Sequence, residues 1–568
     1  MLRLRTEENR IGENIVSSCD HNTVGMKPLR ISLLFFLSLT LFTGGYGQDE
    51  VPFLRKKGNA TQLVVDGKPF IMLGGELGNS SASTMEYMQP VWEKVKEMHL
   101  NTLLVPVYWE LIEPQEGQFD FTLIRNLITE ARKNNLRIVY LWFGSWKNSM
   151  SCYAPAWIKL NEEKYPRIRD DQGRSQEILT AFSPQNLQAD KNAFVHLLNF
   201  TREFDGNQHT VILVQVENEM GMLPTARDYH PLANLAFNTA VPQALITYLQ
   251  ANRDKLMPRV LQAWKENGFR TTGTWEDIFG KSALTDEIFM AWHYAVYSNA
   301  IAEAGKKAYS LPMYVNAALN RPGREPGIGY PSAGPLPHLM DIWKAGAPSI
   351  NFLAPDIYFP DFRHWADLYT SQGDPLFIPE HRFDQTAAFK ALFAIGHYQA
   401  LGFSPFSIES VAKPGDEPLG KIYGLLNQLA PLISSCQGNG RMEGVLLSKD
   451  HPDTTLTLGR YTFTFRHDYT LGWSPEAKAD EWPITAAIIL QTSEDEYYMA
   501  GSGVVVTVKP ADNSLGHAGI LSDEEGRFVL GKWEPTLYLN GDQTHQGRHL
   551  RIPVGNFKIQ RFRIYSYQ

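Results

Sequence analysis

Residues 211–221 read VILVQVENEMG, and this stretch carries the clearest information about the fold. A short apolar run is typical of a strand that is buried in a parallel sheet. Here the run leads directly into Glu217, Asn218 and Glu219. Proteins built on parallel strands place their functional groups at the carboxyl ends of those strands. The stretch therefore predicts a buried strand that opens into a polar cleft.

Other short apolar runs of this kind occur on both sides of the stretch, and helical spacing of apolar residues lies between several of them. A long insertion extends to about residue 284. Eight strands that alternate with helices predict an α/β fold, a (β/α)8 TIM barrel over residues 49–410. The other predicted strands are residues 71–76, 102–109, 136–143, 311–317, 349–355, 375–379 and 402–408. The predicted helices are residues 88–100, 121–135, 191–204 and 285–309, the last with Thr285 as a candidate N-cap.

The character of the sequence changes on both sides of the predicted barrel. Residues 411–440 predict a linking helix, and residues 441–568 alternate β-branched and aromatic residues with turn residues. That pattern is typical of an all-β domain and predicts a β-sandwich. Just before the first barrel strand, Asp66-Gly67 predicts the turn of a β-hairpin.

Residues 1–48 predict an upstream segment followed by a secretory signal. Met26 opens a basic stretch, the apolar run ISLLFFLSLTLF follows, and Gly45 and Gly47 fit a cleavage site. The run is too short to cross a bilayer comfortably, although an anchor that stays attached is the alternative. We expect an exported protein, periplasmic or extracellular, with no stable membrane insertion after the signal is removed. Whether residues 1–25 are translated is left open.

The composition excludes several classes of function. The chain has 568 residues, of which 43% are apolar and 20% charged, so two or three domains with a large core are expected. Its net charge of −8 and its lack of a long basic run argue against a nucleic-acid partner. No zinc-type spacing and no phosphate loop occur, so neither a metal nor an organic cofactor is predicted. Cys152 and Cys436 are either a disulfide or two buried thiols.

The polar residues at the predicted strand ends point to the chemistry. Glu219 follows the fourth strand and Glu380 follows the seventh, so the two carboxyl groups are expected to face each other across the barrel mouth. Such a pair hydrolyses glycosides, with retention when the carboxyl groups lie about 5 Å apart and inversion when they lie farther apart. The alternative is that both are rim residues paired with Lys or Arg. The other strand-end candidates are Glu76, Trp146, Lys147, Asn148, Glu217, Asn218, Asp356 and Tyr358.

The sequence VQVENEMG resembles the acid/base motif of glycoside hydrolase family 35, the β-galactosidases, which belong to a large clan of retaining (β/α)8 enzymes. The resemblance implies that Glu219 is the acid/base, that Asn218 is its neighbouring amide, and that Glu380 in PLFIPEHR is the nucleophile. The stretch VYWELIEPQEGQFDF, with Glu113-Pro114, resembles the strand-two signature of the family. The similarity covers most of residues 50–410.

The C-terminal stretch LYLNGDQTHQGRHLRIP resembles a β-domain found in a bacterial subgroup of the family. That subgroup is associated with β-galactosides, including galactosyl side chains of plant polysaccharides such as xyloglucan. The chain departs from the family after the third strand, where many members carry Cys-Ala-Glu-Trp and this chain reads WFGSWKNSMSCYAPAW. Trp146, Lys147 and Asn148 are expected to take over the role of that Glu. Further departures at Gly78-Asn79 and Pro106 leave the sugar preference open.

Each remaining candidate has a functional and a structural interpretation. Glu76 is expected to bind sugar hydroxyls, with a rim salt bridge as the alternative. Tyr358 is expected to hydrogen-bond the nucleophile and hold it ionised, with a buried barrel tyrosine as the alternative. Glu217 is expected to point inward in a structural hydrogen-bonding role, with direct chemistry as the alternative. Asp356 is expected to be a structural cap, with a third acid as the alternative. Trp146 and Asn148 are expected to contact the substrate. Lys147 either contacts substrate or lowers the pKa of a carboxyl group.

Together these features predict a retaining exo-β-galactosidase that needs no cofactor and acts on a carbohydrate substrate. Another exo-β-glycosidase, such as a β-glucosidase or β-fucosidase, is the first alternative. A glycan-binding barrel without catalysis and a structural surface protein are the others. The oligomeric state cannot be read from the sequence.

Overall fold

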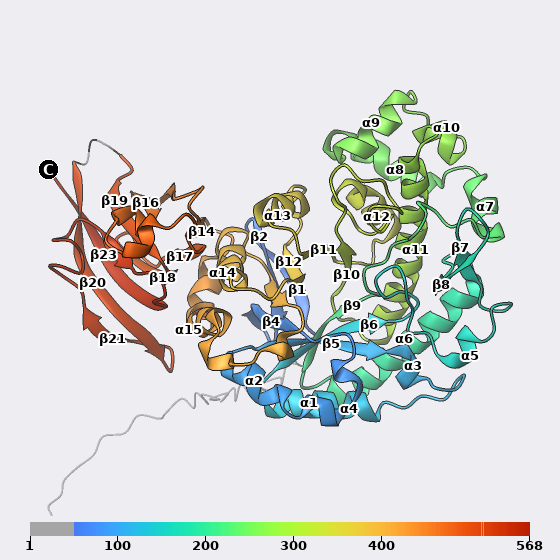
Figure 1. Cartoon of the computed structure of the whole chain (residues 1–568), viewed down its shortest axis with the longest axis horizontal. Coiled ribbons are helices and arrows are strands. Elements are labelled where there is room, and N and C mark those ends of the chain that lie inside the picture. The colour runs from blue at the N-terminus through green and yellow to red at the C-terminus, as the bar shows by residue number, and fades with distance from the viewer. Residues whose placement is uncertain (1–49, 513, 515) are drawn as a thin grey trace, which may run out of the picture. The chain divides into compact units, whose positions relative to one another are not determined.

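The computed structural model describes residues 50–512, 514 and 516–568. The predicted upstream segment and secretory signal, residues 1–48, lie outside the described residues. Within that part of the chain, eight parallel strands close into a barrel, and two antiparallel sheets follow it toward the C-terminus (Figure 1). The predicted TIM barrel with an appended β-domain is therefore confirmed.

The barrel strands follow chain order around the barrel, and neighbouring strands pair in parallel. They are almost entirely buried, as expected for apolar runs covered by helices. The strands are β4 (Met72–Glu76), β5 (Thr102–Tyr108), β6 (Arg137–Phe143), β9 (Val211–Gln215), β10 (Met313–Ala318), β11 (Phe352–Ile357), β12 (Phe377–His381) and β13 (Gly402–Pro405).

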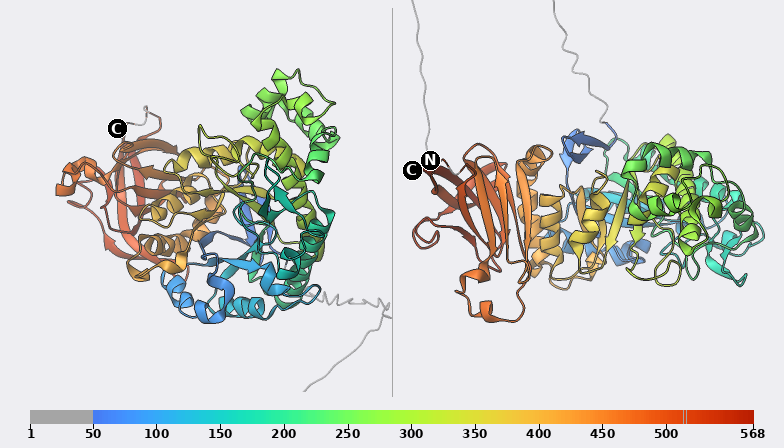
Figure 2. Two further views of the ribbon diagram at one scale, coloured as in Figure 1. Left: turned by 45° about the vertical axis from the view of Figure 1, so that its right-hand side comes forward. Right: turned by 90° about the horizontal axis from the view of Figure 1, so that it is seen from above.

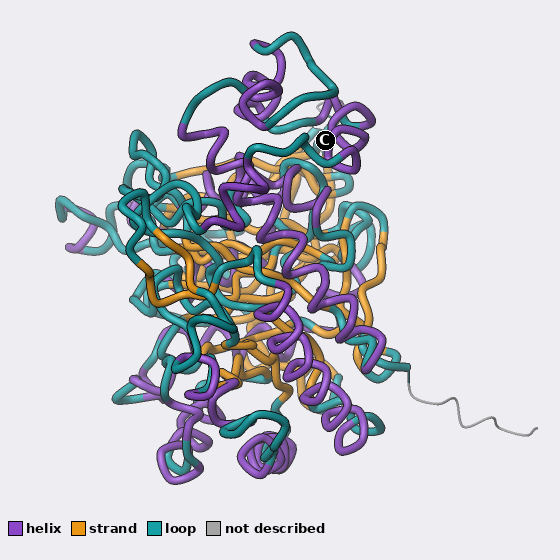
Figure 3. Tube along the Cα trace, turned by 90° about the vertical axis from the view of Figure 1, so that its right-hand side faces the viewer, coloured by secondary structure: helices purple, strands orange, loops and turns teal. Residues whose placement is uncertain are grey.

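Helices lie outside these strands, as Figures 2 and 3 show. One apolar face of α4, formed by Ile124, Leu127, Ile128 and Ala131, is buried as its spacing predicted. The long helices are α4 (Thr122–Lys133), α6 (Pro184–Asp205), α11 (Ala283–Ala308), α14 (Ala387–His397) and α15 (Pro418–Cys436). The shorter helices near the barrel are α1 (Met85–Met88), α2 (Val91–Glu97), α3 (Trp109–Ile112), α5 (Ala156–Lys159), α12 (Met340–Gly346) and α13 (Phe362–Thr370). The insertion before α11 folds as α7 (Pro231–Phe237), α8 (Gln243–Ala251), α9 (Pro258–Glu266) and α10 (Trp275–Phe279).

Three helix boundaries differ from the prediction, each for a local reason. The helix predicted over residues 88–100 is divided into α1 and α2 just before Pro90, which cannot donate a helical hydrogen bond. Helix α6 begins seven residues earlier than predicted because the Ser183 hydroxyl caps it. Helix α11 is capped by Ser282, whose side chain accepts the Thr285 N–H, so Thr285 is not the N-cap.

A small antiparallel sheet precedes the barrel. It contains β1 (Phe53–Lys57), β2 (Ala60–Val65) and β3 (Lys68–Phe70). The predicted hairpin turn at Asp66-Gly67 is present, with φ of 50° and 73°. Two successive positive φ values are what a two-residue type I′ turn requires. A second hairpin, β7 (Arg167–Arg169) with β8 (Ser175–Leu179), lies between β6 and α6.

The C-terminal domain is a sandwich of two antiparallel sheets, as predicted. Its core is formed by inward-facing residues of both sheets, including Phe463, Phe465, Tyr497 and Phe562. One sheet contains β14 (Met442–Leu447), β17 (Thr485–Gln491), β18 (Glu496–Ser502), β23 (Lys558–Tyr567), β20 (His517–Val529) and β21 (Lys532–Tyr538). The other contains β15 (Asp453–Leu458), β16 (Tyr461–His467), β19 (Val504–Pro510) and β22 (Leu550–Ile552).

The predicted linking helix, α15, contacts the barrel and the sandwich. The Tyr423 hydroxyl lies 3.0 Å from the Gly74 carbonyl oxygen and 2.7 Å from that of Phe403, on two adjacent barrel strands. At the C-terminal end of the helix, the Cys436 thiol lies 3.6 Å from the Gln491 carbonyl oxygen. Cys436 and Cys152 are free, buried thiols. Among the described residues, no helix combines the length and the apolar character needed to span a membrane.

Candidate active site

Four carboxyl groups gather at the carboxyl ends of the barrel strands, and we call Glu76, Glu219, Asp356 and Glu380 the mouth cluster. One carboxyl oxygen each of Glu219, Asp356 and Glu380 lies within 4.8 Å of the other two. Parallel pairing explains part of this proximity, because Asp356 on β11 is the register partner of Glu380 on β12. The barrel thus brings Glu219 and Glu380 together from positions 161 residues apart.

Glu380 is buried and held by several partners. Burial and the neighbouring Glu219 raise the pKa of Glu380 to about 7, while the Lys147 ammonium, the Tyr358 hydroxyl and the Glu76 carboxyl act to lower it. The Tyr358 hydroxyl donates a hydrogen bond to Oε1 of Glu380, and Oε2 has no protein partner. The anion of Glu380 is therefore stabilised on one oxygen, while the other stays free to react.

Glu76 and Lys147 set the charge balance around Glu380. Burial, followed by the charge of Glu380, raises the pKa of Glu76 well above its ordinary value. Beside Glu380, the Glu76 carboxyl group therefore favours its neutral form. The Lys147 side chain is buried, with Nζ 5.1 Å from the centre of the Phe143 ring. Its ammonium group favours the ionised form of Glu76, Asp356 and Glu380.

The backbone after β9 has an unusual conformation. Glu217 and Glu219 have φ of 60° and 45°, in the left-handed region that non-glycine residues rarely occupy. The alternation of inward and outward side chains along the strand ends at these residues. The prediction that Glu217 points inward together with Glu219 is therefore wrong. Instead, Oε2 of Glu217 accepts the Trp146 backbone N–H at 2.9 Å, and Asp190 lies beside it. Glu217 has the predicted structural role, but on the side away from the mouth cluster.

Asn218 presents a free donor beside the reactive pair. Its Oδ1 accepts a hydrogen bond from Nε2 of Gln215 at 2.8 Å, while its buried Nδ2 has no protein partner. A buried amide donor of this kind is costly to leave unpaired. Asn218 is therefore suited to donate to a hydroxyl group of a bound sugar.

The structure corrects the expected role of Asp356. It is not a cap but the third acid of the mouth cluster, because β11 places it directly beside Glu380. Burial, followed by the charge of Glu380, raises the pKa of Asp356 well above its ordinary value. Its Oδ2 accepts from Nδ2 of Asn316 at 2.7 Å, and its Oδ1 has no protein partner. Asp356 thus keeps one oxygen available for a ligand.

The substrate contact predicted for Trp146 is not supported. Its indole ring is fully buried and packs edge-on against Tyr294 and Tyr297, with ring centres 5.4 and 4.9 Å apart. Trp146 is therefore part of the core between β6 and α11. Asn148 has a φ of 56°, and its N–H donates to the Asn218 carbonyl at 3.2 Å. This contact makes Asn148 a support for the Asn218–Glu219 segment.

The sequence pattern did not indicate Asn316, which lies on β10. Its Oδ1 accepts the Glu219 backbone N–H at 2.9 Å, and its Nδ2 reaches Asp356. The available signal was one polar residue inside the apolar run MYVNAA, close to the end of a barrel strand.

A cavity of about 420 Å³ opens beside Glu219, a size within the range of small-molecule sites. Its lining combines carboxyl, aromatic and guanidinium groups, which suits a ligand with many hydroxyl groups. The residues of this lining that matter here are Glu219, Asp356, Tyr358, Phe359, Arg321 and Arg382.

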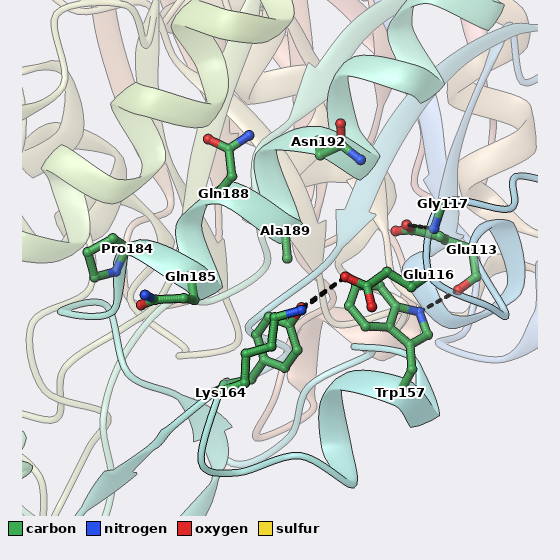
Figure 4. A pocket seen from close by; sticks show the side chains of 11 residues that line it. Glu113, Glu116, Gly117, Trp157, Lys164, Pro184, Gln185, Gln188, Ala189 and Asn192 are labelled. Carbon is green, nitrogen blue, oxygen red and sulfur yellow. Dashed lines mark hydrogen bonds and ion pairs between the residues drawn. The ribbon is translucent and has the colours of Figure 1, made fainter.

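A second cavity, of about 470 Å³, is lined by Glu113, Trp157 and Lys164, and contains no member of the mouth cluster (Figure 4). The carboxyl oxygens of Glu113 accept from Nε1 of Trp109 at 2.8 Å and from the Gly117 N–H at 2.9 Å. Both oxygens are thus used to hold the loop after α3. The Glu113-Pro114 motif is structural in this chain.

Comparisons with known proteins agree with this geometry. Residues 62–285 match the model of glycosyl hydrolases family 35, and residues 419–551 match a domain of unknown function, DUF5597. Residues 62–285 are therefore similar to family 35 glycosyl hydrolases. The matched segment includes Glu76, Asn218 and Glu219 but ends before Asp356 and Glu380. The match therefore says nothing about Glu380, and the closeness of Glu380 to Glu219 is an observation from the structure alone.

Two curated proteins that are similar to this chain are named β-galactosidases. The β-galactosidase of Xanthomonas manihotis is 29% identical over 234 residues, 40% of this chain and 34% of that protein. Beta-galactosidase 11 of Arabidopsis thaliana is 33% identical over 64 residues, 11% of this chain and 8% of that protein. The chain thus matches about a third or less of the length of these relatives.

Among solved structures, the β-galactosidase from Rahnella sp. R3 has a TM-score of 0.45 at 14% identity, covering 64% of this chain and 57% of that one. The enzyme from Halorubrum lacusprofundi has a TM-score of 0.43 at 15% identity, covering 63% of this chain and 58% of that one. Likenesses with TM-scores this low carry no argument about what this chain does.

Proposed function

We propose that the protein is a retaining, exo-acting β-galactosidase that releases terminal β-galactose through a covalent glycosyl-enzyme intermediate. The observation that carries the proposal is the approach of the Glu219 and Glu380 carboxyl oxygens to within 4.8 Å. Retaining glycosidases place their two carboxyl groups about 5–5.5 Å apart, whereas inverting enzymes leave about 6.5–9.5 Å for a water molecule. The spacing in this barrel supports retention.

The proposed mechanism assigns one task to each group at the barrel mouth. Protonated Glu219 donates its proton to the glycosidic oxygen while the Glu380 carboxylate attacks the anomeric carbon, so the bond to the leaving group breaks as the bond to Glu380 forms. Glu219, now ionised, then removes a proton from water, which displaces Glu380 and releases the sugar with its original anomeric configuration. Tyr358 keeps Glu380 oriented and favours its anion.

Free hydrogen-bonding atoms surround the reacting pair. Nδ2 of Asn218, Oε1 of Glu76 and Oδ1 of Asp356 are buried and have no protein partner. These atoms can exchange hydrogen bonds with sugar hydroxyls in a site that excludes water. Because Glu380 is buried, its position supports an enzyme that admits one terminal sugar rather than the middle of a glycan chain. The choice of galactose is supported by the names of the relatives.

The natural glycan is a further part of the proposal. Galactosyl side chains of oligosaccharides or polysaccharides, with xyloglucan as one candidate, are supported by the resemblance of residues 537–553 to a β-domain of one bacterial subgroup. Export to the periplasm or the medium is also proposed, from the signal-like segment that begins at Met26. N-terminal sequencing of the secreted protein tests this, with Gln48 expected as the first residue and an intact segment 26–47 contradicting it.

The first experiment compares nitrophenyl β-galactoside, β-glucoside and β-fucoside as substrates and follows the product by proton NMR. We expect the galactoside to be preferred and the β-anomer of galactose to appear first. Preference for another sugar would replace galactose by that sugar, and an α-anomer as first product would overturn retention. Absence of turnover on all three, with binding of galactose, would support the glycan-binding alternative.

A cation is not expected to take part, although three carboxyl oxygens lie close enough to hold one. Donors already face this cluster: the Tyr358 hydroxyl, Nδ2 of Asn316 and the Lys147 ammonium. The positive charge of Lys147 near these oxygens, together with the donor hydrogens of Tyr358 and Asn316, opposes the binding of a cation. Incubation with EDTA is therefore expected to leave hydrolysis unchanged, and loss of activity that Mg²⁺ or Ca²⁺ restores would contradict this.

A further inference from the structure

The side chain of Asn316 joins three parts of the barrel mouth. Its Oδ1 accepts the backbone N–H of Glu219 at 2.9 Å, and its Nδ2 lies 2.7 Å from Oδ2 of Asp356 and 3.3 Å from Oδ1 of Asn218. The side chain is buried on β10, which lies between β9 and β11 in the barrel. One amide therefore links the proposed acid/base, its neighbouring amide and the third carboxyl group.

The orientation of this amide is fixed by its partners. A backbone N–H only donates, so the atom that faces Glu219 must be the carbonyl oxygen of Asn316. The NH2 group must then face Asp356, whose Oδ2 is its acceptor. The same group faces Oδ1 of Asn218, and Asn218 is itself oriented by the Gln215 amide at 2.8 Å. Each hydrogen bond in this series of amides therefore pairs a donor with an acceptor.

Glu219 depends on such support because its backbone is strained. A left-handed backbone conformation is unfavourable for a residue other than glycine and persists only when its surroundings hold it. Its N–H is held by Asn316, and its carbonyl oxygen accepts from Oγ of Ser149 at 3.2 Å. Within the described part of the chain, the Glu219 carboxyl group itself has no hydrogen-bond partner that would fix it. Its position is therefore set by its backbone.

We propose that Asn316 is a positioning residue that holds the acid/base Glu219 over the glycosidic oxygen and ties it to Asp356. The inference rests on the proposed glycosidase function and adds a residue of β10 to its machinery. Asn316 does not reach the reacting atoms itself. It acts through the peptide N–H of Glu219 and through the Asn218 amide.

The proposal predicts which substrates suffer when Asn316 is changed to Ala. A displacement of about 1 Å of a reacting group lowers rates by about 100-fold. Galactosides with a poor leaving group need the proton of Glu219, so Asn316→Ala should lower their kcat/KM by about that factor. A dinitrophenyl β-galactoside releases a stable anion without a proton, so its kcat/KM should fall by less than about tenfold. The ratio of the two values is the readout.

A second variant tests the two arms of the amide separately. Asn316→Asp keeps an oxygen for the Glu219 N–H, but it can donate to Asp356 only while it is protonated. Its kcat/KM should therefore approach the wild-type value at acid pH and fall away as the pH rises. A simple loss of folding would instead lower activity at every pH.

Asn101 offers a matched control at the opposite end of the barrel strands. Its Oδ1 accepts the Leu73 N–H at 2.8 Å, and its Nδ2 donates to the Ile71 carbonyl at 2.9 Å. Asn101→Ala thus also removes an amide that bridges two barrel segments, but far from the mouth. We expect it to lower thermal stability while leaving the kcat/KM ratio of the two substrates as in the wild type.

The deciding experiment measures both substrates for the wild type, Asn316→Ala and Asn101→Ala, together with a crystal structure of Asn316→Ala. A selective loss on the poor leaving group in Asn316→Ala alone, with Glu219 displaced in the crystal, supports the proposal. An equal loss on both substrates, or an undisplaced Glu219, overturns it. If the wild type hydrolyses neither substrate, the proposed function fails, and the crystal structure alone then decides whether Asn316 positions Glu219.

Discussion

Buried acids occur in two kinds of surroundings in this barrel. Asp190 and Asp205 are completely buried, and each carboxyl oxygen has at least one donor. For Asp205, Oδ1 pairs with the Arg132 guanidinium at 2.7 Å, and Oδ2 accepts the Val211 N–H at 2.7 Å. We call Asp190 and Asp205 the anchored acids. Their geometry is what stability requires of a buried carboxylate.

The mouth cluster also contains buried acids, but not all of their carboxyl oxygens accept a hydrogen bond. Glu76, Asp356 and Glu380 are nearly as buried, at 2%, 2% and 6% exposure, yet each keeps one oxygen without a protein donor. Burial, followed by the charge of a neighbouring carboxyl group, raises the pKa of all three. The comparison teaches that burial alone does not mark a functional acid. The mouth is distinguished by the gathering of several such acids around Glu219 at the strand ends.

The largest effect that tests this comparison is on catalysis. Glu380→Gln removes the attacking carboxylate, so kcat on a nitrophenyl β-galactoside should fall by about 10⁴-fold or more. Glutamine has the same shape and no charge to bury, so the melting temperature should not fall. Steady-state kinetics and differential scanning fluorimetry on the same preparation measure both quantities. Near-normal kcat in a folded Glu380→Gln protein would show that the free oxygen of Glu380 is not the nucleophile.

The opposite pattern is expected for an anchored acid. Asp205→Ala leaves Arg132 and the Val211 N–H without their partner, so the free energy of unfolding should fall by about 3 kcal/mol. The catalytic rate per folded molecule should stay close to that of the wild type. Urea denaturation and active-site titration separate the two effects. A specific loss of kcat without a loss of stability would break the distinction between the two kinds of acid.

Tyr358→Phe tests how the anion of Glu380 is maintained. Burial raises the pKa of Glu380 and the Tyr358 hydroxyl lowers it. With both effects present, the pKa is about 7. Without that hydroxyl the pKa of Glu380 rises further, so the acid limb of the kcat/KM profile moves to higher pH. Since a hydrogen bond to a charged group contributes about 1.5–3 kcal/mol, a loss of about tenfold or more is expected at pH 6. An acid limb that stays in place would contradict this role of Tyr358.

The smallest predicted effect is on stability. Asp356→Asn should stabilise the protein, whereas Asp205→Ala should destabilise it. The raised pKa of Asp356 means that the folded state keeps a proton that the unfolded state has released. The wild type therefore loses stability as the pH rises above the unfolded carboxyl pKa, about 4. Asp356→Asn removes this cost, so it should stabilise the protein by about 1 kcal/mol at pH 8 and less at pH 5. Melting temperatures at the two pH values measure the difference, and a destabilised variant at pH 8 would contradict the account.

Much of the barrel could be predicted because its strands are short apolar runs with polar ends. The same pattern located Glu219 and Glu380, since strand ends converge at one rim whatever the details of the loops. Boundaries that depend on a single cap or proline, such as Ser282 and Pro90, were less visible. Their effect depends on which of several competing residues the local backbone selects.

Other parts of the site could not be predicted, because they depend on contacts between distant segments. The pairing of Asp356 with Glu380 follows from the register of β11 against β12. The link from Asn316 to Glu219 joins residues that are 97 positions apart. The direction of the Trp146 ring depends on its packing against α11, which no local pattern reveals.

The central claim is that Glu380 forms a covalent bond to the sugar while Glu219 lies within 4.8 Å. The most direct test is incubation with dinitrophenyl 2-deoxy-2-fluoro-β-galactoside, whose fluorine slows hydrolysis of the intermediate, followed by peptide mass spectrometry. One fluorogalactosyl group on the peptide that contains PLFIPEHR, at Glu380, is the predicted result. A label on Glu76, Glu219 or Asp356, or inverted product with no label, would contradict the account.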